Sequence, residues 1–184
     1  MEDKKIFRNK ILDIRKNLTR TQVKEMSIKV CKKLLSSDLY RQSQSIFCYS
    51  AVRNELDLTF FIEKALRDGK SISLPKVLDK KGLMKFYEIH SITGLERGTF
   101  GILEPSSQNE NIAADIILVP GVVFSKQGDR IGQAGGFYDR FLEKNNIYSV
   151  GICYDFQLFD KIPHEKHDKK MNKIISEQRE IDII

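Results

Sequence analysis

The chain has 184 residues, of which 41% are hydrophobic and 30% charged, and its formal net charge is +6. This length predicts a single domain over residues 1–184, because domains typically contain about 100–200 residues. The longest apolar run without a charge, 116–125, is about half of the roughly 20 residues that a membrane span needs, so a membrane protein is not expected. Charges at the start of the chain, with no apolar stretch after them, argue against a signal peptide.

The cysteine count and the charge balance narrow the class of protein further. Cys31, Cys48 and Cys153 have no C-x-x-C spacing, which predicts neither a disulfide scaffold nor a zinc site and favours a reducing, cytoplasmic compartment. The 31 basic residues outnumber the 25 acidic ones. This surplus fits a nucleic acid or an anionic small molecule as ligand. A solvated surface with a basic tilt explains it equally well.

The first third of the sequence predicts two helices. One apolar stripe recurs at i, i+4, i+7 and i+11 and consists of Phe7, Ile11, Ile14 and Leu18. Thr19 followed by Gln22 matches a capping box that opens a second helix. The apolar stripe of that helix contains Val23, Met26 or Ser27, Val30 and Leu34.

Further along the chain, short apolar strands alternate with helical segments. The expected strands are 45–50, 71–75, 83–89, 116–120, 150–154 and 174–175. One helix is expected to begin at Asp57 and end at Gly69, and another to begin near Gly136. The alternation predicts an α/β fold with a mostly parallel, doubly wound sheet flanked by helices. Because ligands bind beyond the carboxyl ends of such strands, the expected site loops follow Ser50, Pro75, Pro120 and Tyr154.

A glycine-rich segment, 128–140, holds the densest set of candidate ligand-binding residues. Three glycines within the five residues 132–136 follow a buried strand and lead into an amphipathic segment, so free backbone N–H groups at a helix start can bind phosphate. Arg130 can add a bidentate guanidinium, and Asp139 can hold magnesium against the phosphates. Neither G-x-G-x-x-G nor G-x-x-x-x-G-K-[ST] is present. A tight turn that needs glycine backbone angles explains the same residues without a ligand.

Two further candidates are a basic stripe and an acidic loop. Lys4, Arg8 and Arg15 border the apolar face of the first predicted helix. They either reach into a cleft or extend over the rim of the core. Glu55 and Asp57 follow the strand 45–50, where they either accept N–H groups of a ligand or simply start the next helix.

The last candidate is the segment 163–168, which contains two histidines beside acidic residues. Its spacing is not H-E-x-x-H and no cysteine is near, so it does not match a zinc site. Asp168 can instead join Asp139 in holding a hard cation such as Mg²⁺.

Taken together, and in their order along the chain, several short segments resemble the sequence pattern of the 5-formyltetrahydrofolate cyclo-ligase family. The resemblance rests on K-x-x-x-R at the start, a glutamate after a strand, L-P-K, F-G-I-L-E-P, the long glycine-rich run and a late proline and aspartate. These lie at 4–8, 54–57, 74–76, 100–105, 119–142 and 163–168. The chain departs from the family pattern at Ser125, Ala134 and Phe137, which replace aspartate, glycine and tyrosine.

The resemblance implies an ATP- and Mg²⁺-dependent ligase that cyclises 5-formyltetrahydrofolate to 5,10-methenyltetrahydrofolate through a phosphorylated formyl group, giving ADP and phosphate. It also implies the architecture of sugar-phosphate isomerases and CoA transferases. The implied ATP-binding residues are Lys4, Lys5, Ile6, Phe7, Arg8, Arg130, Ile131, Gly132, Gln133, Ala134, Gly135, Gly136, Phe137 and Tyr138. Those implied for the folate are Arg8, Ser50, Glu55, Gln133, Ala134, Gly135, Gly136 and Phe137. Asp139 and Asp168 are the implied magnesium ligands.

The expected partners are ATP and a folate that can carry several glutamates, with neither nucleic acid nor a membrane, and the expected state is a cytoplasmic monomer. Two other classes stay open on the residues alone. A basic nucleic-acid-binding module explains the charge but not the concentration of glycine, Arg130 and Asp139 in one loop. A sugar-phosphate isomerase or acyl-CoA transferase of similar architecture is not distinguished by its fold.

Overall fold

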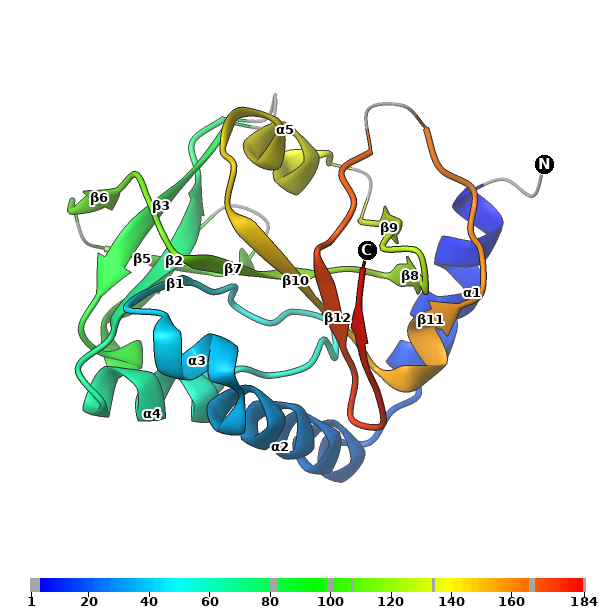
Figure 1. Ribbon diagram of the computed structural model, residues 1–184, viewed down its shortest axis with the longest axis horizontal. Helices are drawn as coiled ribbons and strands as arrows, with labels where there is room; N and C mark the ends of the chain where they lie inside the picture. The colour runs from blue at the N-terminus through cyan, green and yellow to red at the C-terminus, as the bar shows by residue number, and fades with distance from the viewer. Residues whose placement is uncertain are drawn as a thin grey trace.

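A central sheet of eight strands organises the molecule (Figure 1), with the strand order β13-β12-β10-β7-β1-β2-β3-β6. The computed structural model describes residues 4–79, 83–98, 101–106, 108–133, 135–165 and 168–183. The strands of the sheet are β1 (Ser45–Phe47), β2 (Ser71–Val77), β3 (Met84–Ile89), β6 (Glu110–Asn111), β7 (Ile116–Pro120), β10 (Tyr148–Ile152), β12 (Lys173–Ile175) and β13 (Glu180–Asp182).

The middle of this sheet is parallel. Strands β12, β10, β7, β1 and β2 pair in parallel, whereas β13 at one edge and β3 and β6 at the other pair antiparallel. From β1 the chain continues to β2 on one side and later to β7 on the other, so the winding direction changes between β1 and β7. The predicted mostly parallel, doubly wound α/β sheet is confirmed. Ligands of such sheets bind where the winding changes.

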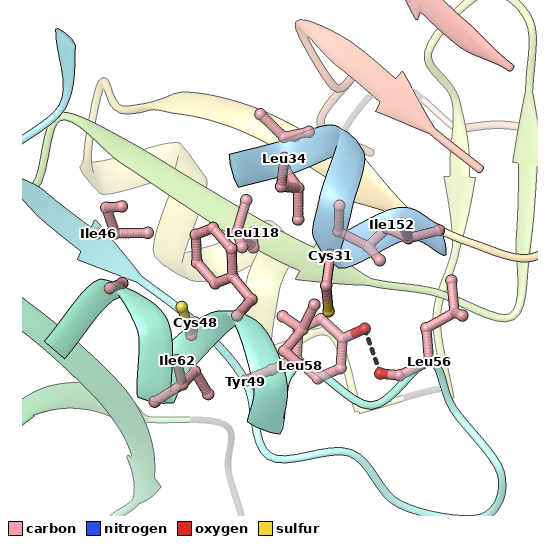
Figure 2. Packing of buried hydrophobic residues seen from close by; sticks show 14 of the residues in the cluster. Cys31, Leu34, Ile46, Cys48, Tyr49, Leu56, Leu58, Ile62, Leu118 and Ile152 are labelled. Atoms are coloured by element: carbon pink, nitrogen blue, oxygen red, sulfur yellow. Dashed lines mark hydrogen bonds between the residues drawn. The ribbon is translucent and has the colours of Figure 1, made fainter. Parts of the chain in front are cut away.

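Helices cover both faces of the sheet. Helices α2 (Arg20–Ser36), α3 (Asp38–Gln42) and α4 (Thr59–Arg67) lie on one face, and α5 (Phe137–Lys144) lies on the other (Figure 1). Figure 2 shows the first core, in which Cys31 and Leu34 of α2 and Ile62 of α4 pack in one cluster with Leu118. The neighbouring residue Val119 packs in the second core with α5. Burial on both faces explains why β7 is a continuous apolar run.

A second, smaller layer supports the N-terminal helix α1 (Lys4–Lys16). Ile11 of α1 packs in a third core with Val122, Val123 and Ile131, beside a small sheet of β8 (Val123–Ser125), β9 (Arg130–Ile131) and β11 (Leu158–Phe159). The hairpin β4 (Leu95–Arg97) and β5 (Leu103–Pro105) and the short helices η1 (Ile92–Gly94) and η3 (Asp155–Gln157) complete the elements named here.

The predicted helix and strand limits are mostly close to those of the structure. The capping box of Thr19 and Gln22 is present at the start of α2. Helix α4 has Leu58 as its N-cap, one residue after the expected cap Asp57, although the Asp57 carboxylate still accepts the N–H of Thr59 at 2.8 Å. Strand β1 ends at Phe47, before Ser50, and β10 ends at Ile152. No helix in the described parts of the chain is long and apolar enough to cross a membrane.

The predicted inner face of the first helix is confirmed for Ile11 and Phe7, which pack in the third core, but was wrong at Ile14. Ile14 was expected to face the core, but 40% of its surface is exposed. Arg15 is buried in its place, at 1% exposure, together with Ile11. The helix is therefore turned so that a charged residue faces inward, which is tolerated only where polar partners are in reach.

Candidate active site

A cavity of about 1010 Å³ opens beside the carboxyl ends of β1 and β7. Its walls come from α1, from strand β2, from the loops after β1 and β7, from the β4–β5 hairpin and from the glycine-rich segment before α5. Two of the four predicted site loops, those after Ser50 and Pro120, line it, whereas Pro75 lines it from within β2, which continues to Val77. Tyr154 does not belong to the described lining; its hydroxyl donates to the Asn54 carbonyl at 3.0 Å.

Arg130 is held rigidly in the wall of this cavity. Its guanidinium donates to the Pro120 carbonyl at 3.3 Å and to Asp139 Oδ2 at 2.9 Å, and only 4% of the side chain is exposed. The guanidinium also lies 5.7 Å from the centre of the Tyr138 ring. A guanidinium fixed in this way presents its charge without a large loss of side-chain entropy, as phosphate recognition requires.

Gly136 sets the start of α5. It is the N-cap residue and has a φ of +63°, in the left-handed region that favours glycine. With no side chain, it leaves the N–H groups of the first helical turn uncapped. Gly135, Gly136 and Phe137 all line the cavity. A glycine loop followed by a helix N-terminus, an arrangement that can bind phosphate, therefore lies at the cavity wall.

Helix α1 contributes two cations to the same cavity. Lys4 Nζ lies 2.6 Å from Asp168 Oδ2 and 3.3 Å from Glu165 Oε1. Burial lowers the pKa of Lys4, but the hydrogen bonds and charges of these two carboxylates outweigh it and raise the pKa above its usual value. Arg8 Nε donates to the Gly132 carbonyl at 2.9 Å, so it connects α1 to the glycine-rich segment.

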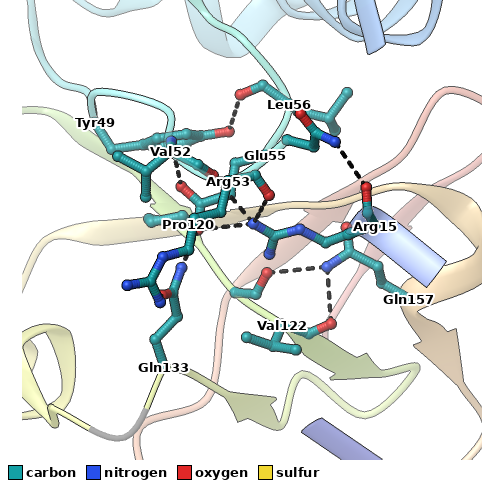
Figure 3. A network of polar contacts seen from close by, with 12 residues as sticks. Arg15, Tyr49, Val52, Arg53, Glu55, Leu56, Pro120, Val122, Gln133 and Gln157 are labelled. Carbon is teal, nitrogen blue, oxygen red and sulfur yellow. Dashed lines mark hydrogen bonds and ion pairs between the residues drawn. The ribbon is translucent and has the colours of Figure 1, made fainter. Parts of the chain in front are cut away.

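Glu55 also lines the cavity, and 8% of it is exposed. Its carboxylate accepts hydrogen bonds from Gln133 Nε2 at 2.8 Å and from the Val52 N–H at 3.1 Å, and it lies 3.5 Å from Arg15 Nη2 (Figure 3). Burial raises the pKa of Glu55, and the charge of Arg15 and the hydrogen bonds oppose this without reversing it. A carboxylate in this position can accept N–H groups of a ligand.

The hairpin of β4 and β5 closes the Glu55 side of the cavity. The Ser50 hydroxyl donates to the Leu103 carbonyl at 2.6 Å, which attaches the hairpin to the loop after β1. Glu104, 5% exposed, lines the cavity and accepts the Val77 N–H at 3.2 Å. Ser50, which was predicted to line the folate pocket, therefore also holds the β4–β5 hairpin through this hydrogen bond.

The predicted ATP residues of α1 do not all lie at the cavity. Lys4 and Arg8 line it, but Ile6 is 54% exposed, and the Phe7 ring packs edge-to-face on Phe159 with centroids 5.3 Å apart. Lys5 is exposed and is not among the lining residues. Of the glycine-rich segment, the predicted residues that line the cavity are Arg130, Ile131, Gly132, Gln133, Gly135, Gly136, Phe137 and Tyr138. Ala134 lies outside the described residues.

The donor set for a metal consists of two carboxylates. Asp139 and Asp168 line the same cavity, and each has a cation as its partner, Arg130 and Lys4 respectively. Within the described residues, no group of three or more His, Cys, Asp or Glu side chains is placed to hold a metal ion. Mg²⁺ typically takes one or two protein carboxylates together with phosphate oxygens. The residues present therefore fit Mg²⁺ bound with a nucleotide.

Several lining residues were not predicted. They include Tyr49, Arg53, Arg97 and Glu104. Glu104 belongs to the F-G-I-L-E-P motif, so the motif carried a signal for it. No signal in the sequence pointed to Arg53. Its φ of +50° is uncommon for an arginine and is determined by contacts from distant segments.

The fold is that of an α/β protein with a cavity, lined by a glycine-rich segment, where the winding of its sheet changes. The model of the 5-formyltetrahydrofolate cyclo-ligase family matches residues 1–177, and the chain belongs to this family of ligases. A 5-formyltetrahydrofolate cyclo-ligase from Haemophilus influenzae is 29% identical over 92% of this chain and 95% of that protein.

Solved structures agree with this assignment. The NMR structure of Aquifex aeolicus 5,10-methenyltetrahydrofolate synthetase has a TM-score of 0.88 and 32% identity, and it covers 98% of this chain and 92% of that one. A 5,10-methenyltetrahydrofolate synthetase from Mycoplasma pneumoniae has the same fold, with a TM-score of 0.78 at 24% identity. The predicted family, fold and ligase class are confirmed.

Proposed function

We propose that the chain catalyses the ATP- and Mg²⁺-dependent cyclisation of 5-formyltetrahydrofolate to 5,10-methenyltetrahydrofolate. One observation carries the proposal: a single cavity joins a cationic glycine-rich wall to a buried, hydrogen-bonded carboxylate, Glu55. The names of the relatives, cyclo-ligase and methenyltetrahydrofolate synthetase, support this choice of substrate and product.

The ATP phosphates are expected at the cationic wall. Arg130, Lys4 and Arg8 supply positive charge, and Gly135 and Gly136 supply backbone N–H groups at the start of α5. Phosphoryl transfer depends mainly on position and on charge neutralisation, and side chains held this firmly satisfy both demands. Ile131, Gly132, Gln133, Phe137 and Tyr138 complete the proposed nucleotide site.

The folate is expected on the Glu55 side. The carboxylate accepts two neighbouring N–H groups of the pterin ring, and Ser50 lines the same pocket. Arg8, Gln133 and the glycines before α5 lie between the two halves and contact both ligands in this proposal. The surplus of positive charge suits two polyanions, ATP and a folate that carries glutamates.

The chemistry accounts for the need for ATP. A formamide oxygen is a poor leaving group, so the γ-phosphoryl group is transferred to it, the bond to the ADP oxygen breaks, and an iminium phosphate forms. N10 then attacks the formyl carbon, the carbon–oxygen bond breaks, and phosphate leaves with that oxygen while N10 loses its proton to water. Asp139 and Asp168 would hold Mg²⁺, which neutralises phosphate charge when it is bound.

The remaining properties are proposed on simpler grounds. Residues 1–184 form one cyclo-ligase domain that acts as a monomer. Cys31, Cys48 and Cys153 are buried free thiols, which supports a reducing, cytoplasmic compartment.

An absorbance assay for the methenyl product, started from 5-formyltetrahydrofolate, tests the proposal. ATP and Mg²⁺ are varied separately, and product formation is expected to require both. An enzyme of the isomerase or acyl-CoA transferase class would show no dependence on ATP, and a failure to form the methenyl product with both present would reject the assignment.

A further inference from the structure

Arg15 is the most deeply buried charged residue in the described parts of the chain. It lies on α1, two helical turns after Arg8. Its guanidinium donates to the Arg53 carbonyl at 2.8 Å and the Val52 carbonyl at 3.2 Å, and it lies 3.5 Å from Glu55 Oε1 (Figure 3). Burying a guanidinium is costly, and its Nε and Nη1 have no hydrogen-bond partner among the residues that the structure describes. Its position therefore points to a role beyond packing.

The turn that Arg15 contacts has an unusual backbone. Arg53 and Asn54 have φ angles of +50° and +56°, two consecutive left-handed residues without a glycine. Such residues persist only where surrounding contacts hold them. The contacts come from α1 and from the far end of the chain: Asn54 Nδ2 donates to the Arg15 carbonyl at 2.9 Å, and the Tyr154 hydroxyl donates to the Asn54 carbonyl. Glu55 follows this turn directly.

Arg15 also supplies the positive charge next to Glu55. Tyr49, Tyr138 and Tyr154 also interact with this carboxyl, but burial raises the pKa of each, so they stay neutral near pH 7. The Arg53 guanidinium reaches it indirectly, by donating to Gln133 Oε1 at 3.2 Å. Gln133 and the Val52 N–H donate hydrogen bonds but carry no charge. Burial favours the protonated form of Glu55, and the positive charge of Arg15 is the largest effect that opposes it.

We propose that Arg15 is a positioning residue for the folate: it keeps Glu55 ionised and holds the turn 52–55 so that the carboxylate faces the cavity. The inference rests on the proposed function, in which Glu55 accepts pterin N–H groups. The ligand class that this arrangement selects is a fused heterocycle with two adjacent N–H donors. Because α1 also carries Arg8, which binds the Gly132 carbonyl, one helix fixes both halves of the cavity.

The test is equilibrium binding of 5-formyltetrahydrofolate without ATP, measured from about pH 5 to pH 9, the range in which a raised carboxyl pKa falls. Wild type is compared with R15Q, R15K and E55Q. Wild-type affinity is expected to fall on acidification, as Glu55 takes up a proton. In R15Q this fall should move to higher pH, with binding at least about tenfold weaker at pH 7 and partial recovery as the pH rises.

R15K is the matched control for charge. Lysine keeps a positive charge but is shorter than arginine, whose Nη2 alone contacts both carbonyls and the carboxylate, so its midpoint should match wild type while its affinity falls about fivefold. The E55Q profile should be nearly flat and reports any titration of the folate itself. Affinity for a non-hydrolysable ATP analogue should stay within about twofold of wild type in R15Q, because Arg15 lies on the folate side.

The proposal would be overturned if R15Q bound the folate with the affinity and the pH midpoint of wild type. It would also be overturned if R15Q only lowered the melting temperature and left the pH midpoint of folate binding unchanged. If R15Q does not fold, the double variant R15Q/E55Q removes both buried charges; folding of the double variant alone supports the inference. If neither folds, wild-type affinity in R15K overturns the positioning role and a fivefold loss supports it. Unaltered affinity in E55Q rejects the proposed folate contact itself, which separates the two failures.

Discussion

Lys4 Nζ and Asp168 Oδ2 lie 2.6 Å apart, although the two residues are 164 positions apart in sequence. A cation proposed for phosphate thus neutralises a carboxylate proposed for magnesium, and Arg130 does the same for Asp139 at 2.9 Å. A metal ion would compete with these cations for the two carboxylates. Phosphates can take over both cations, so nucleotide and metal are expected to bind together.

The first prediction concerns this exchange of partners. The Kd of Mg²⁺ should fall by about tenfold or more when a non-hydrolysable ATP analogue is present, as calorimetry can measure. Asp168→Asn should reduce this coupling, whereas Asp160→Asn, at an exposed ion pair with Lys126, should leave it unchanged. Equal magnesium affinity with and without the analogue would contradict the idea.

Arg130→Ala should weaken ATP binding more than folate binding. The guanidinium is fixed by Pro120 and Asp139, and a hydrogen bond to a charged group is worth about 1.5–3 kcal/mol, so a loss of about tenfold to a hundredfold is expected. Titration with an ATP analogue measures it. Arg67→Ala, on the exposed side of α4, is the matched control. Unchanged nucleotide affinity would remove Arg130 from the phosphate site.

Glu55→Gln should raise the folate KM while ATP affinity stays nearly intact. The amide retains one acceptor and loses the charge, a change worth about 1.5–3 kcal/mol for charge-assisted bonds. Because burial raises the pKa of Glu55, wild-type folate binding should weaken as the pH falls through that raised value. Steady-state kinetics over pH measures both effects; a wild-type KM would make Glu55 a helix-start acid only.

The hydrogen bonds of Ser125 explain why this chain departs from the family pattern at that position. Its hydroxyl donates to Asp129 Oδ2 at 2.7 Å and accepts the N–H groups of Asp129 at 3.1 Å and Gln127 at 3.2 Å. Restoring the family's aspartate would place two buried carboxylates in contact. Ser125→Asp should therefore lower the free energy of unfolding by about 2 kcal/mol, as urea unfolding can measure.

The double variant Ser125→Asp/Asp129→Asn is the control for that substitution. It restores a donor opposite the new carboxylate and should recover most of the lost stability. A single variant as stable as wild type would mean that the turn rearranges without cost.

Gly136→Ala should weaken ATP binding and destabilise the protein. An alanine there is strained at a φ of +63°, by about 1–2 kcal/mol, and its Cβ would lie 2.7 Å from Arg140 Nη1. Gly94→Ala is the matched control, because nothing lies within 4 Å of its Cβ. Thermal unfolding and ATP titration measure the two effects. An affinity loss as large in Gly94→Ala would show that the effect is not local.

The parts of the fold that could be predicted are those whose signal is local. Strand β7 was predicted with its observed limits because burial on both faces leaves a continuous apolar run. The Thr19 capping box was equally local. Arg15 was not predicted to face inward, since its partners are carbonyls that lie 37 and 38 residues away.

The same reason limits prediction of the site. The glycines and charged residues of the segment before α5 indicate a ligand site, because they lie close together in the sequence. The Lys4–Asp168 pair and the left-handed turn at Arg53 and Asn54 depend on contacts between distant segments. Side-chain partners of this kind follow from the packed structure and leave no periodic pattern.

The three cysteines provide built-in reporters of how the two helical layers open. Cys31 and Cys48 lie in the core under α2 and α4, whereas Cys153 lies in the core under α5. Burial raises the pKa of Cys31 to about 11, and it raises the pKa of the other two thiols as well. Thiol-reactive reagents therefore modify these residues only when a layer detaches. Mass spectrometry of the alkylated peptides would time the detachment of each layer separately, without any engineered label.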